Sequence, residues 1–258
     1  MTRLLILTIS SLILVGCASG TGGSYNPTVY PFEIDNELLA TTEIKRVVIA
    51  PVNLGGATRN YLEDSEADVD KQVRDYLESN GFDVVSQRRF QQEWKTATRI
   101  YGNPIDPTSG RVNQKTFTLA LVAVRDALVK SDDLDAIVFT DIIEKDIAFN
   151  GGLKHLARWD GVTRKPTLQG PGDGVSTDFD WNKNAKGASI WVNVYTVELQ
   201  RVFSSVGGID ATQAIDTRSA TGAYVRRRNV LENKNFIQEG IEIAFHPFIE
   251  MGGYPGNE

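Results

Sequence analysis

The sequence predicts an α/β (α+β) domain in which a mixed sheet of about five strands is packed against helices. Two observations predict this class. Short β-branched segments alternate with amphipathic helical segments in the first half of the chain, and long strands follow one another in the second half. A final amphipathic segment gives the order β-α-β-α-α-β-β-β-α. With 258 residues, 41% of them hydrophobic, the chain is long enough to bury a sizeable core.

The first half supplies two short strands and three helices. The run "KRVVIAPV" (45–52) is β-branched and ends at a proline, which predicts a buried strand. Residues 65–68 have the capping-box pattern and Asn80-Gly81 is a C-cap signal, so we expect a helix between them. The segment "FDVVSQ" (82–87) is the second strand. Apolar residues at helical spacing mark two further helices, one on Phe90, Trp94 and Ala97 and one on Phe117, Leu121, Val124 and Leu128.

The second half supplies the longer strands. The segments "DAIVFTDIIEKDIAF" (135–149) and "GASIWVNVYTVEL" (187–199) both predict long strands. A turn at residues 204–208 is expected to lead into residues 207–216, which would form the antiparallel partner of the second long strand.

The two long strands are separated by an insertion, and a helix ends the domain. Residues 150–186 are rich in Gly, Pro and Asp, so we expect a loop of about 35 residues there. Apolar residues recur at helical spacing from Ile237 to Phe248, and they predict a last helix that Pro247 cuts short.

The amino terminus has the features of a bacterial secretory signal. Arg3 supplies a positive charge, and residues 4–15 are apolar apart from three hydroxyl residues. About 12 residues are too few for the roughly 20 that a membrane-spanning helix needs. The stretch Leu14-Val15-Gly16-Cys17 resembles the lipobox of bacterial lipoproteins, and Cys17 is the only cysteine of the chain.

The lipobox resemblance implies a covalent anchor at Cys17. The thiol would carry diacylglycerol, cleavage would fall between Gly16 and Cys17, and the new amine of Cys17 would be acylated. Several acyl chains anchor a protein stably, at about 0.8 kcal/mol per buried CH₂. Ala18 stands where an Asp would retain such proteins in the inner membrane, so the resemblance implies the outer membrane, with the domain facing the periplasm. No cofactor other than this lipid is expected.

The expected domain organisation follows from these features. Residues 1–16 are the signal peptide, 17–42 the lipidated cysteine with a Gly/Ser/Pro-rich tether, 43–250 a single periplasmic domain, and 251–258 a tail. The formal net charge of −6 and the pI near 5.1 argue against a nucleic-acid partner, because phosphate binding needs a basic surface.

The segments "KRVVIAPV", "GFDVVSQRRF", "DLDAIVFTDI" and "WVNVYTV" and the last amphipathic helix together resemble a family of periplasmic lipoprotein domains. This family is the CsgG, LpoB and TolB amino-terminal type, and the resemblance covers residues 43–250. It implies a protein that binds envelope partners or assembles rings and is not an enzyme. A CsgG-like secretion component is one alternative. A pore wall, however, needs strands with one polar face. Residues 190–195 are largely apolar on both faces, which favours a sheet that is covered on both sides.

The sequence contains no recognisable catalytic or metal-binding motif, so we assign no catalytic residue and no metal. It has two distant histidines, and it lacks both a Gly-x-Ser-x-Gly elbow and a Walker loop. Carboxylate pairs leave a periplasmic hydrolase as an alternative. Asp173, Asp178 and Asp180 form a weak candidate calcium loop, although turn chemistry explains the same composition.

The insertion also contains the candidate partner-binding residues Arg158, Trp159, Arg164 and Lys165. Tryptophan and arginine dominate binding hot spots, whereas Trp159 alternatively anchors the loop to the sheet. The run "YVRRRN" (224–229) is either a site for anionic groups or a solvated charged segment. We therefore expect an accessory lipoprotein that binds an envelope protein or a second copy of itself. The alternative is a hydrolase or carbohydrate-binding protein with its site in residues 150–186.

Overall fold

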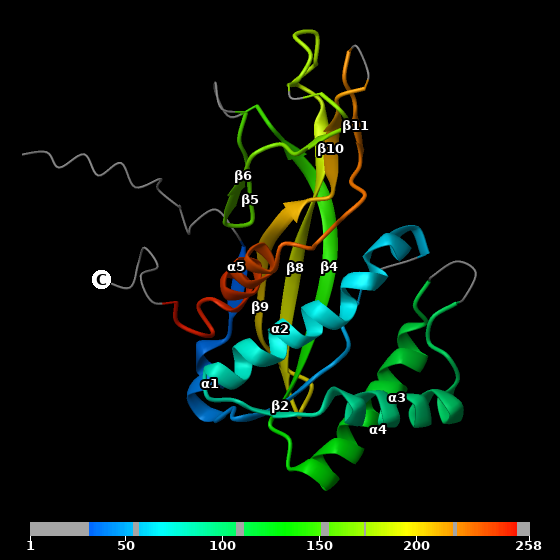
Figure 1. Ribbon diagram of the computed structural model, residues 1–258. Coiled ribbons are helices and arrows are strands. Elements are labelled where there is room, and N and C mark those ends of the chain that lie inside the picture. Colours follow the sequence, from blue (N-terminus) through cyan, green and yellow to red (C-terminus); the bar gives the residue numbers. More distant parts are fainter. Residues whose placement is uncertain are drawn as a thin grey trace, which may run out of the picture.

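A six-stranded mixed sheet forms the centre of the molecule (Figure 1). The computed structural model describes residues 31–53, 57–106, 111–150, 155–172, 174–218 and 221–251. The sheet has the order β1-β9-β8-β4-β2-β3, in which β2 pairs in parallel with β3 and β4 and the other pairs are antiparallel. The predicted α+β class is confirmed. The strands are β1 (Phe32–Ile34), β2 (Arg46–Ile49), β3 (Asp83–Val85), β4 (Ala136–Ala148), β8 (Asn184–Thr196) and β9 (Arg201–Ala211).

Helices cover both faces of this sheet. The helices α2 and α5 lie on one face, in front of the long strands in Figure 1, whereas α3 and α4 pack on the other face at the lower right. The elements are α1 (Asn36–Thr41), the 3-10 helix η2 (Ala57–Ser65), α2 (Glu66–Ser79), α3 (Gln87–Tyr101), α4 (Gln114–Asp132) and α5 (Lys234–Phe245). Among the described residues, every helix is too short or too polar to cross a bilayer.

The larger core lies between the sheet and the helices α2 and α5. The alternate residues Ile190, Val192 and Val194 of β8 point into it, as the pleat of a strand requires. Helix α5 approaches β9 most closely at two glycines, because a Cβ on Gly207 would lie 1.9 Å from the carbonyl oxygen of Gly240. Only a chain with glycine at this contact allows the two backbones to approach so closely.

The second core lies under α3 and α4. Ile137 and Phe139 of β4 point toward these helices, on the face opposite to the larger core. The Phe90 ring meets the Phe139 ring edge-on with centroids 6.2 Å apart, and the Trp94 ring meets Phe117 of α4 at 5.6 Å. The predicted helical stripes are therefore the faces that pack.

The predicted turn at residues 204–208 is wrong. The strand β8 ends at Thr196 and β9 begins at Arg201, so residues 204–208 lie inside a strand. The chain reverses at residues 197–200, where Leu199 adopts a left-handed φ of 60° and Thr196 donates its N–H to the carbonyl of Gln200 at 2.9 Å. Gly207 and Gly208 serve close packing instead of chain reversal.

The expected loop at residues 150–186 is also corrected. It contains the strands β5 (Ala157–Trp159), β6 (Val162–Arg164) and β7 (Leu168–Gln169), and β8 begins before residue 187. Strand β7 joins β10 (Gln213–Asp216) and β11 (Tyr224–Arg226) in a three-stranded sheet of order β11-β10-β7. Figure 1 shows β5, β6, β10 and β11 at the upper end of the long strands.

The fold also begins before residue 43, where the domain was expected to start. Strand β1 pairs with residues 203–205 of β9, and Asp35 caps α1 by accepting the N–H of Leu38 at 2.9 Å. Helix α2 begins at Glu66 as expected, but the Ser65 side chain makes no cap hydrogen bond. The Ser65 hydroxyl instead donates to the Val230 carbonyl at 3.2 Å.

Candidate partner-binding surface

The β5–β6 hairpin is folded onto the sheet. Asp160 and Gly161 form its two-residue turn with φ values of 40° and 85°, the left-handed pair that suits a type I′ turn. Trp159 is only 7% exposed, and its indole N–H donates to the Ala188 carbonyl at 3.4 Å. A Cβ on Gly208 would lie 2.4 Å from a Val162 methyl carbon, so this glycine leaves room for the hairpin. Trp159 therefore anchors the insertion.

The turn of the hairpin is fixed by polar contacts. The buried Asp160 carboxylate pairs with Lys145 of β4 at 2.7 Å and accepts the hydroxyl of Ser189 of β8 at 2.6 Å. The Asp160 carbonyl accepts the Gly208 N–H of β9 at 2.7 Å. These contacts join three strands of the large sheet to one hairpin turn. Lys145, which interrupts the apolar face of its strand in the sequence, finds its partner here.

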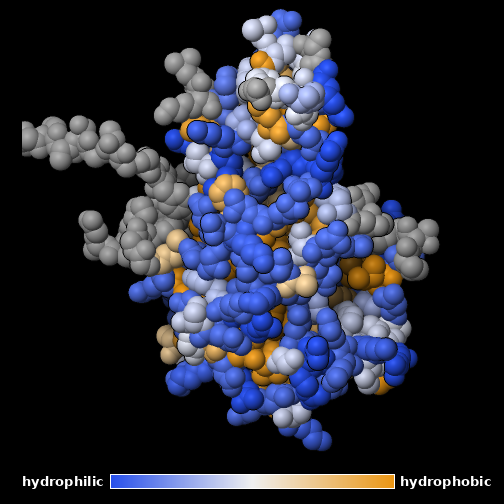
Figure 2. Space-filling view, in the orientation of Figure 1, coloured by the Kyte–Doolittle hydropathy of each residue, from blue (hydrophilic) through white to orange (hydrophobic). Residues whose placement is uncertain are grey.

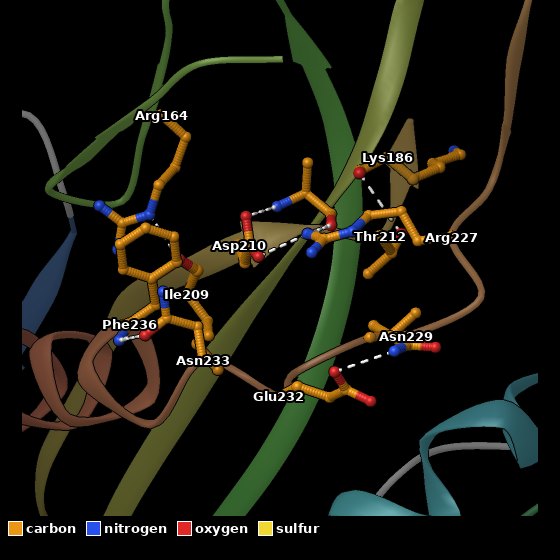
Figure 3. A network of polar contacts seen from close by, with 12 residues as sticks. Arg164, Lys186, Ile209, Asp210, Thr212, Arg227, Asn229, Glu232, Asn233 and Phe236 are labelled. Carbon is orange, nitrogen blue, oxygen red and sulfur yellow. Dashed lines mark hydrogen bonds and ion pairs between the residues drawn. The ribbon is translucent and has the colours of Figure 1, made fainter. Parts of the chain in front are cut away.

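The upper part of β9 is a strand edge that side chains cap (Figure 3). In the described part of the chain, β1 pairs only with residues 203–205, which leaves the carbonyls of residues further along β9 without a strand partner on that side. The Arg164 guanidinium donates through Nε to the Ile209 carbonyl at 2.8 Å and pairs with Glu239 at 2.7 Å. Its Cζ also lies 3.9 Å from the centre of the Phe236 ring. Arg164 therefore caps the edge and joins it to α5.

Arg227 caps the next part of the same edge. Its guanidinium pairs with the buried Asp210 carboxylate and donates to the Ala211 carbonyl at 2.8 Å. The other side of the Asp210 carboxylate accepts the Ala211 N–H at 2.8 Å. Edge strands attract other strands unless their polar groups are covered, so Arg164 and Arg227 protect this edge. We name these contacts of Arg164, Asp210 and Arg227 the edge cap.

The structure separates the predicted partner-binding residues into two pairs. Arg158 and Lys165 are exposed, whereas Trp159 and Arg164 are buried in packing and capping contacts. The arginine run is divided in the same way, because Arg226 pairs with Glu144 at 3.0 Å and Arg227 pairs with Asp210. The side chain of Arg228 is exposed. Three of the six cations of these two segments, Arg164, Arg226 and Arg227, are thus paired with carboxylates of the fold.

An uncovered region of the sheet contains a tryptophan that the sequence did not single out. Along β4, Phe139 contacts α3 and Lys145 contacts the β5–β6 hairpin. The β4 residues between these two positions therefore lie between helix α3 and the hairpin, which each cover part of this face. The facing position on β8 is Trp191, which is 37% exposed and donates its indole N–H to the Ser204 hydroxyl at 2.9 Å. By strand register, this open sheet face comprises Asp141, Ile143, Trp191, Asn193, Ser204 and Val206.

The open sheet face combines an apolar ring with an unused acceptor. Asn193 is 7% exposed, and its Oδ1 atom accepts no hydrogen bond from any described residue. Directly opposite Trp191, Val206 lies under the same surface. An exposed indole is the kind of aromatic anchor that carries most of the binding energy at the centre of an interface. The sequence alternation had instead suggested that both faces of the sheet are covered.

A hollow of about 390 Å³ lies beside the ends of β2 and β3, where α3 begins. Asp70, Arg74 and Glu78 line it from α2, with Gln87 and Arg88 opposite. The Asp70 carboxylate accepts the Val52 N–H at 2.9 Å and the Gln87 amide at 2.7 Å. Burial raises the pKa of Asp70 to about 6, although these two hydrogen bonds oppose the shift. The second carboxylate of the hollow, on Glu78, is exposed. Asp70 therefore serves to join α2 to the strands, not as half of a buried carboxylate pair.

We expect Asp70→Asn to remove a pH dependence of stability. The folded-state pKa of about 6 lies above the ordinary 3.8, so the ionised carboxylate lowers the free energy of unfolding above about pH 6. The cost fades as the pH falls below the folded-state pKa. In urea unfolding, the variant should exceed the parent by about 1–3 kcal/mol at pH 7.5 and lose this advantage near pH 4. The exposed Asp68→Asn is the control; an equal loss of stability at both pH values would contradict the assignment.

The remaining predicted residues are those of the candidate calcium loop and the lipidation site. Asp173, Gly16 and Cys17 lie outside the described residues. Asp178 and Asp180 are exposed, and the Asp180 carboxylate accepts the Asn182 N–H at 3.0 Å, which is an ordinary turn contact. Within the described ranges, no group of three His, Cys, Asp or Glu side chains is arranged to hold a metal ion.

The insertion contains a second hollow, of about 480 Å³. The His155 ring stacks on the Trp181 ring with centroids 3.4 Å apart and planes 8° apart. The hydroxyl residues Ser176 and Thr177 and the exposed Lys165 complete much of the lining. An aromatic stack beside hydroxyls and a cation is a lining that suits a polar ligand with an apolar face, such as a sugar ring.

Comparisons with known proteins add little to this geometry. No protein-family model and no curated protein sequence matches the chain. Among solved structures, the chain is similar to a dodecamer of a PelC variant from Paraburkholderia phytofirmans, with a TM-score of 0.28 and 8% sequence identity. The match covers 78% of this chain and 84% of that chain. A likeness of this size carries no inference about function.

Proposed function

We propose that the chain is a lipid-anchored accessory protein of the outer membrane, which binds an envelope protein through the open sheet face in the periplasm. The observation that carries the binding role is Trp191, a half-exposed indole in the middle of a long sheet that is otherwise covered on both faces. Asn193, Ser204 and Val206 lie beside this indole on the same face of the sheet.

A lipid anchor supports this role because it raises the local concentration of the domain at the membrane. The lipobox at residues 14–17 is followed by a Gly/Ser/Pro-rich stretch, and such a tether confines the domain to a thin layer beside the bilayer. Confinement raises the effective concentration of the domain near membrane-bound partners without any added contact. The exposed residues Arg158 and Lys165 lie on the neighbouring insertion and are available to the same partner.

Site-specific photo-crosslinking tests the proposal. A benzophenone amino acid in place of Trp191 keeps a large aromatic group at the site, and the exposed Lys130 on α4 is the control position. In intact cells, position 191 should give one discrete adduct with an envelope protein, and position 130 should not. The adduct should disappear when Cys17→Ala prevents anchoring, because the effective concentration falls. An adduct of twice the chain mass would show self-association instead, and the absence of any adduct would contradict the proposal.

A second candidate function is glycan binding in the insertion. The 480 Å³ hollow beside Trp181 and His155 favours it, since sugar rings stack on aromatic faces and bond to hydroxyls. Soluble cell-wall glycan fragments should then bind the parent chain and fail to bind Trp181→Ala. Equal binding, or none to either chain, would leave the open sheet face as the binding region.

A further inference from the structure

Large exposed apolar side chains gather at one end of the α3–α4 hairpin. Of the nine such residues in the described part of the chain, six belong to this hairpin. Figure 2 shows hydrophobic surface on the right of the view, beside the position that α3 and α4 occupy in Figure 1. Single exposed apolar residues are ordinary, but a concentration of them marks an interaction site. We name as the α3–α4 tip the residues Ile100 (68% exposed), Tyr101, Ile105, Val112 and Leu119.

A β-bridge and backbone hydrogen bonds hold the segment that forms the tip. Helix α3 ends at Tyr101, and the connecting segment is held by an antiparallel bridge between Ile105 and Val112. The Asn113 N–H donates to the Pro104 carbonyl at 2.7 Å, and the Asn113 side chain caps α4. The inner faces of both helices are already packed on the sheet, so the tip residues are not needed for the core.

The charge around the tip has the opposite sign to that of the chain. Residues 95–119 contain four basic residues and one acidic residue, whereas the whole chain has a net charge of −6. All four basic side chains are exposed. Among the described residues, no ion pair joins Lys95, Arg99 or Lys115 to a carboxylate. Apolar side chains surrounded by bases are the pattern of surfaces that enter the headgroup region of anionic bilayers.

We propose that the α3–α4 tip docks on an anionic lipid surface, with its apolar side chains in the headgroup region and Lys95, Arg99 and Lys115 near the phosphates. The inference rests on the proposed function for the presence of a bilayer. Residues 18–30 separate Cys17 from the described fold, which begins at residue 31. Fully extended, this segment reaches roughly 50 Å, so an anchor at Cys17 would keep the domain near the surface.

Docking at the tip would orient the domain. The insertion and β10–β11 lie at the upper end in Figure 1, whereas α3 and α4 lie at the lower end. A tip held on lipid would therefore fix the orientation of the insertion relative to the bilayer. The second anchoring point also restricts the tumbling that a flexible tether alone permits.

Fluorescence on the lipidated full-length mature protein tests the proposal. A lipidated Cys17 has no free thiol, so a cysteine introduced as Ile105→Cys can be labelled alone with the environment-sensitive dye NBD. Thr163→Cys, on the exposed side of β6, is the matched control. In vesicles of phosphatidylethanolamine and phosphatidylglycerol, the dye at 105 should shift to the blue and be quenched by nitroxide lipids, while the dye at 163 should not change.

Charge variants test whether docking depends on the bases around the tip. Lys95→Glu with Arg99→Glu should weaken docking at least about tenfold, because the loss of each base costs roughly a fivefold factor near anionic lipid. Arg158→Glu with Lys165→Glu makes the same charge change on the insertion and should leave docking intact. Neutral phosphatidylcholine vesicles should show much weaker quenching.

Three outcomes decide the matter. A dye at 105 that stays in water on anchored protein in anionic vesicles would overturn the proposal. If the dye at position 105 is shielded from water in native envelopes but not in pure lipid vesicles, another protein covers the tip. This result would also overturn the proposal. A free Cys17 thiol would contradict the lipid anchor alone. Docking of the tip would still be supported if the fluorescence of the dye at position 105 shifted to the blue in anionic vesicles.

Discussion

Replacing Arg227 with methionine is expected to lower the free energy of unfolding by about 3–5 kcal/mol, since the change leaves a buried charge without its partner. Asp210 is 6% exposed, and its carboxylate contacts the Arg227 guanidinium and the Ala211 N–H. Methionine keeps much of the apolar volume of arginine and removes the charge. Urea unfolding at neutral pH measures the loss.

The neighbouring arginine supplies a matched control for this prediction. The Arg228 side chain is exposed, so Arg228→Met should change stability by no more than about 0.5 kcal/mol. Adding Asp210→Asn to Arg227→Met removes the unpaired charge and should restore part of the loss. The single variant also uncovers the Ala211 carbonyl on the β9 edge, so it should self-associate on gel filtration more than the parent does. A stable, monomeric Arg227→Met chain would contradict the edge cap.

Replacing Gly207 with alanine is expected to cost about 3 kcal/mol or more. The added Cβ would lie 1.9 Å from the Gly240 carbonyl oxygen and 2.8 Å from the Ala244 nitrogen, both of which are backbone atoms of α5. A backbone cannot rotate out of the way as a flexible side chain can, so the whole helix must move from its contact with β9. Overpacking a well-packed core costs about 1–3 kcal/mol and occasionally more, and a clash with the backbone of a helix belongs at the upper end of this range.

Gly174 gives the control for the helix contact. A Cβ at this position meets no atom within 4 Å, so Gly174→Ala should leave the urea midpoint nearly unchanged. The Gly207 variant should also lose the tight packing around Phe245, which would appear as weaker near-ultraviolet circular dichroism. A Gly207→Ala chain as stable as the Gly174→Ala chain would show that α5 is not held as closely as the structure indicates.

Periodicity was sufficient for the elements whose packing faces are continuous. The stripe of Phe117, Leu121, Val124 and Leu128 predicted α4, and the apolar run at 45–52 predicted β2. Both predictions were possible because the spacing of apolar residues shows whether one face of an element or both faces are buried. The capping signal predicted where α2 begins, even though Ser65 turns its hydroxyl to Val230.

Glycines and charged residues were harder to interpret from the sequence. Gly207-Gly208 predicted a turn, yet both glycines serve close contacts with elements distant in sequence. The turn that does occur depends on the left-handed φ of Leu199, which its residue type does not indicate. In contrast, Asp160-Gly161 between Trp159 and Val162 is a strong hairpin signal that the expected loop overlooked.

Residue composition alone did not show which of the candidate partner-binding residues are exposed. Tryptophan beside arginine predicts an interface, but Trp159 and Arg164 are buried by partners on β8, β9 and α5, which lie far away in sequence. The exposed indole is Trp191, in a strand that is apolar on both faces near its centre. Whether such a strand is covered depends on where α3, α4 and the hairpin end, and only the folded structure determines this.

Mass spectrometry of the amino-terminal peptide of the purified mature protein tests the anchor on which the proposed function depends. We expect a chain that starts at Cys17, with diacylglycerol on the sulfur and an acyl group on the amine. A chain with a free Cys17 thiol and an unmodified amino terminus, or one that still begins at Met1, would contradict it.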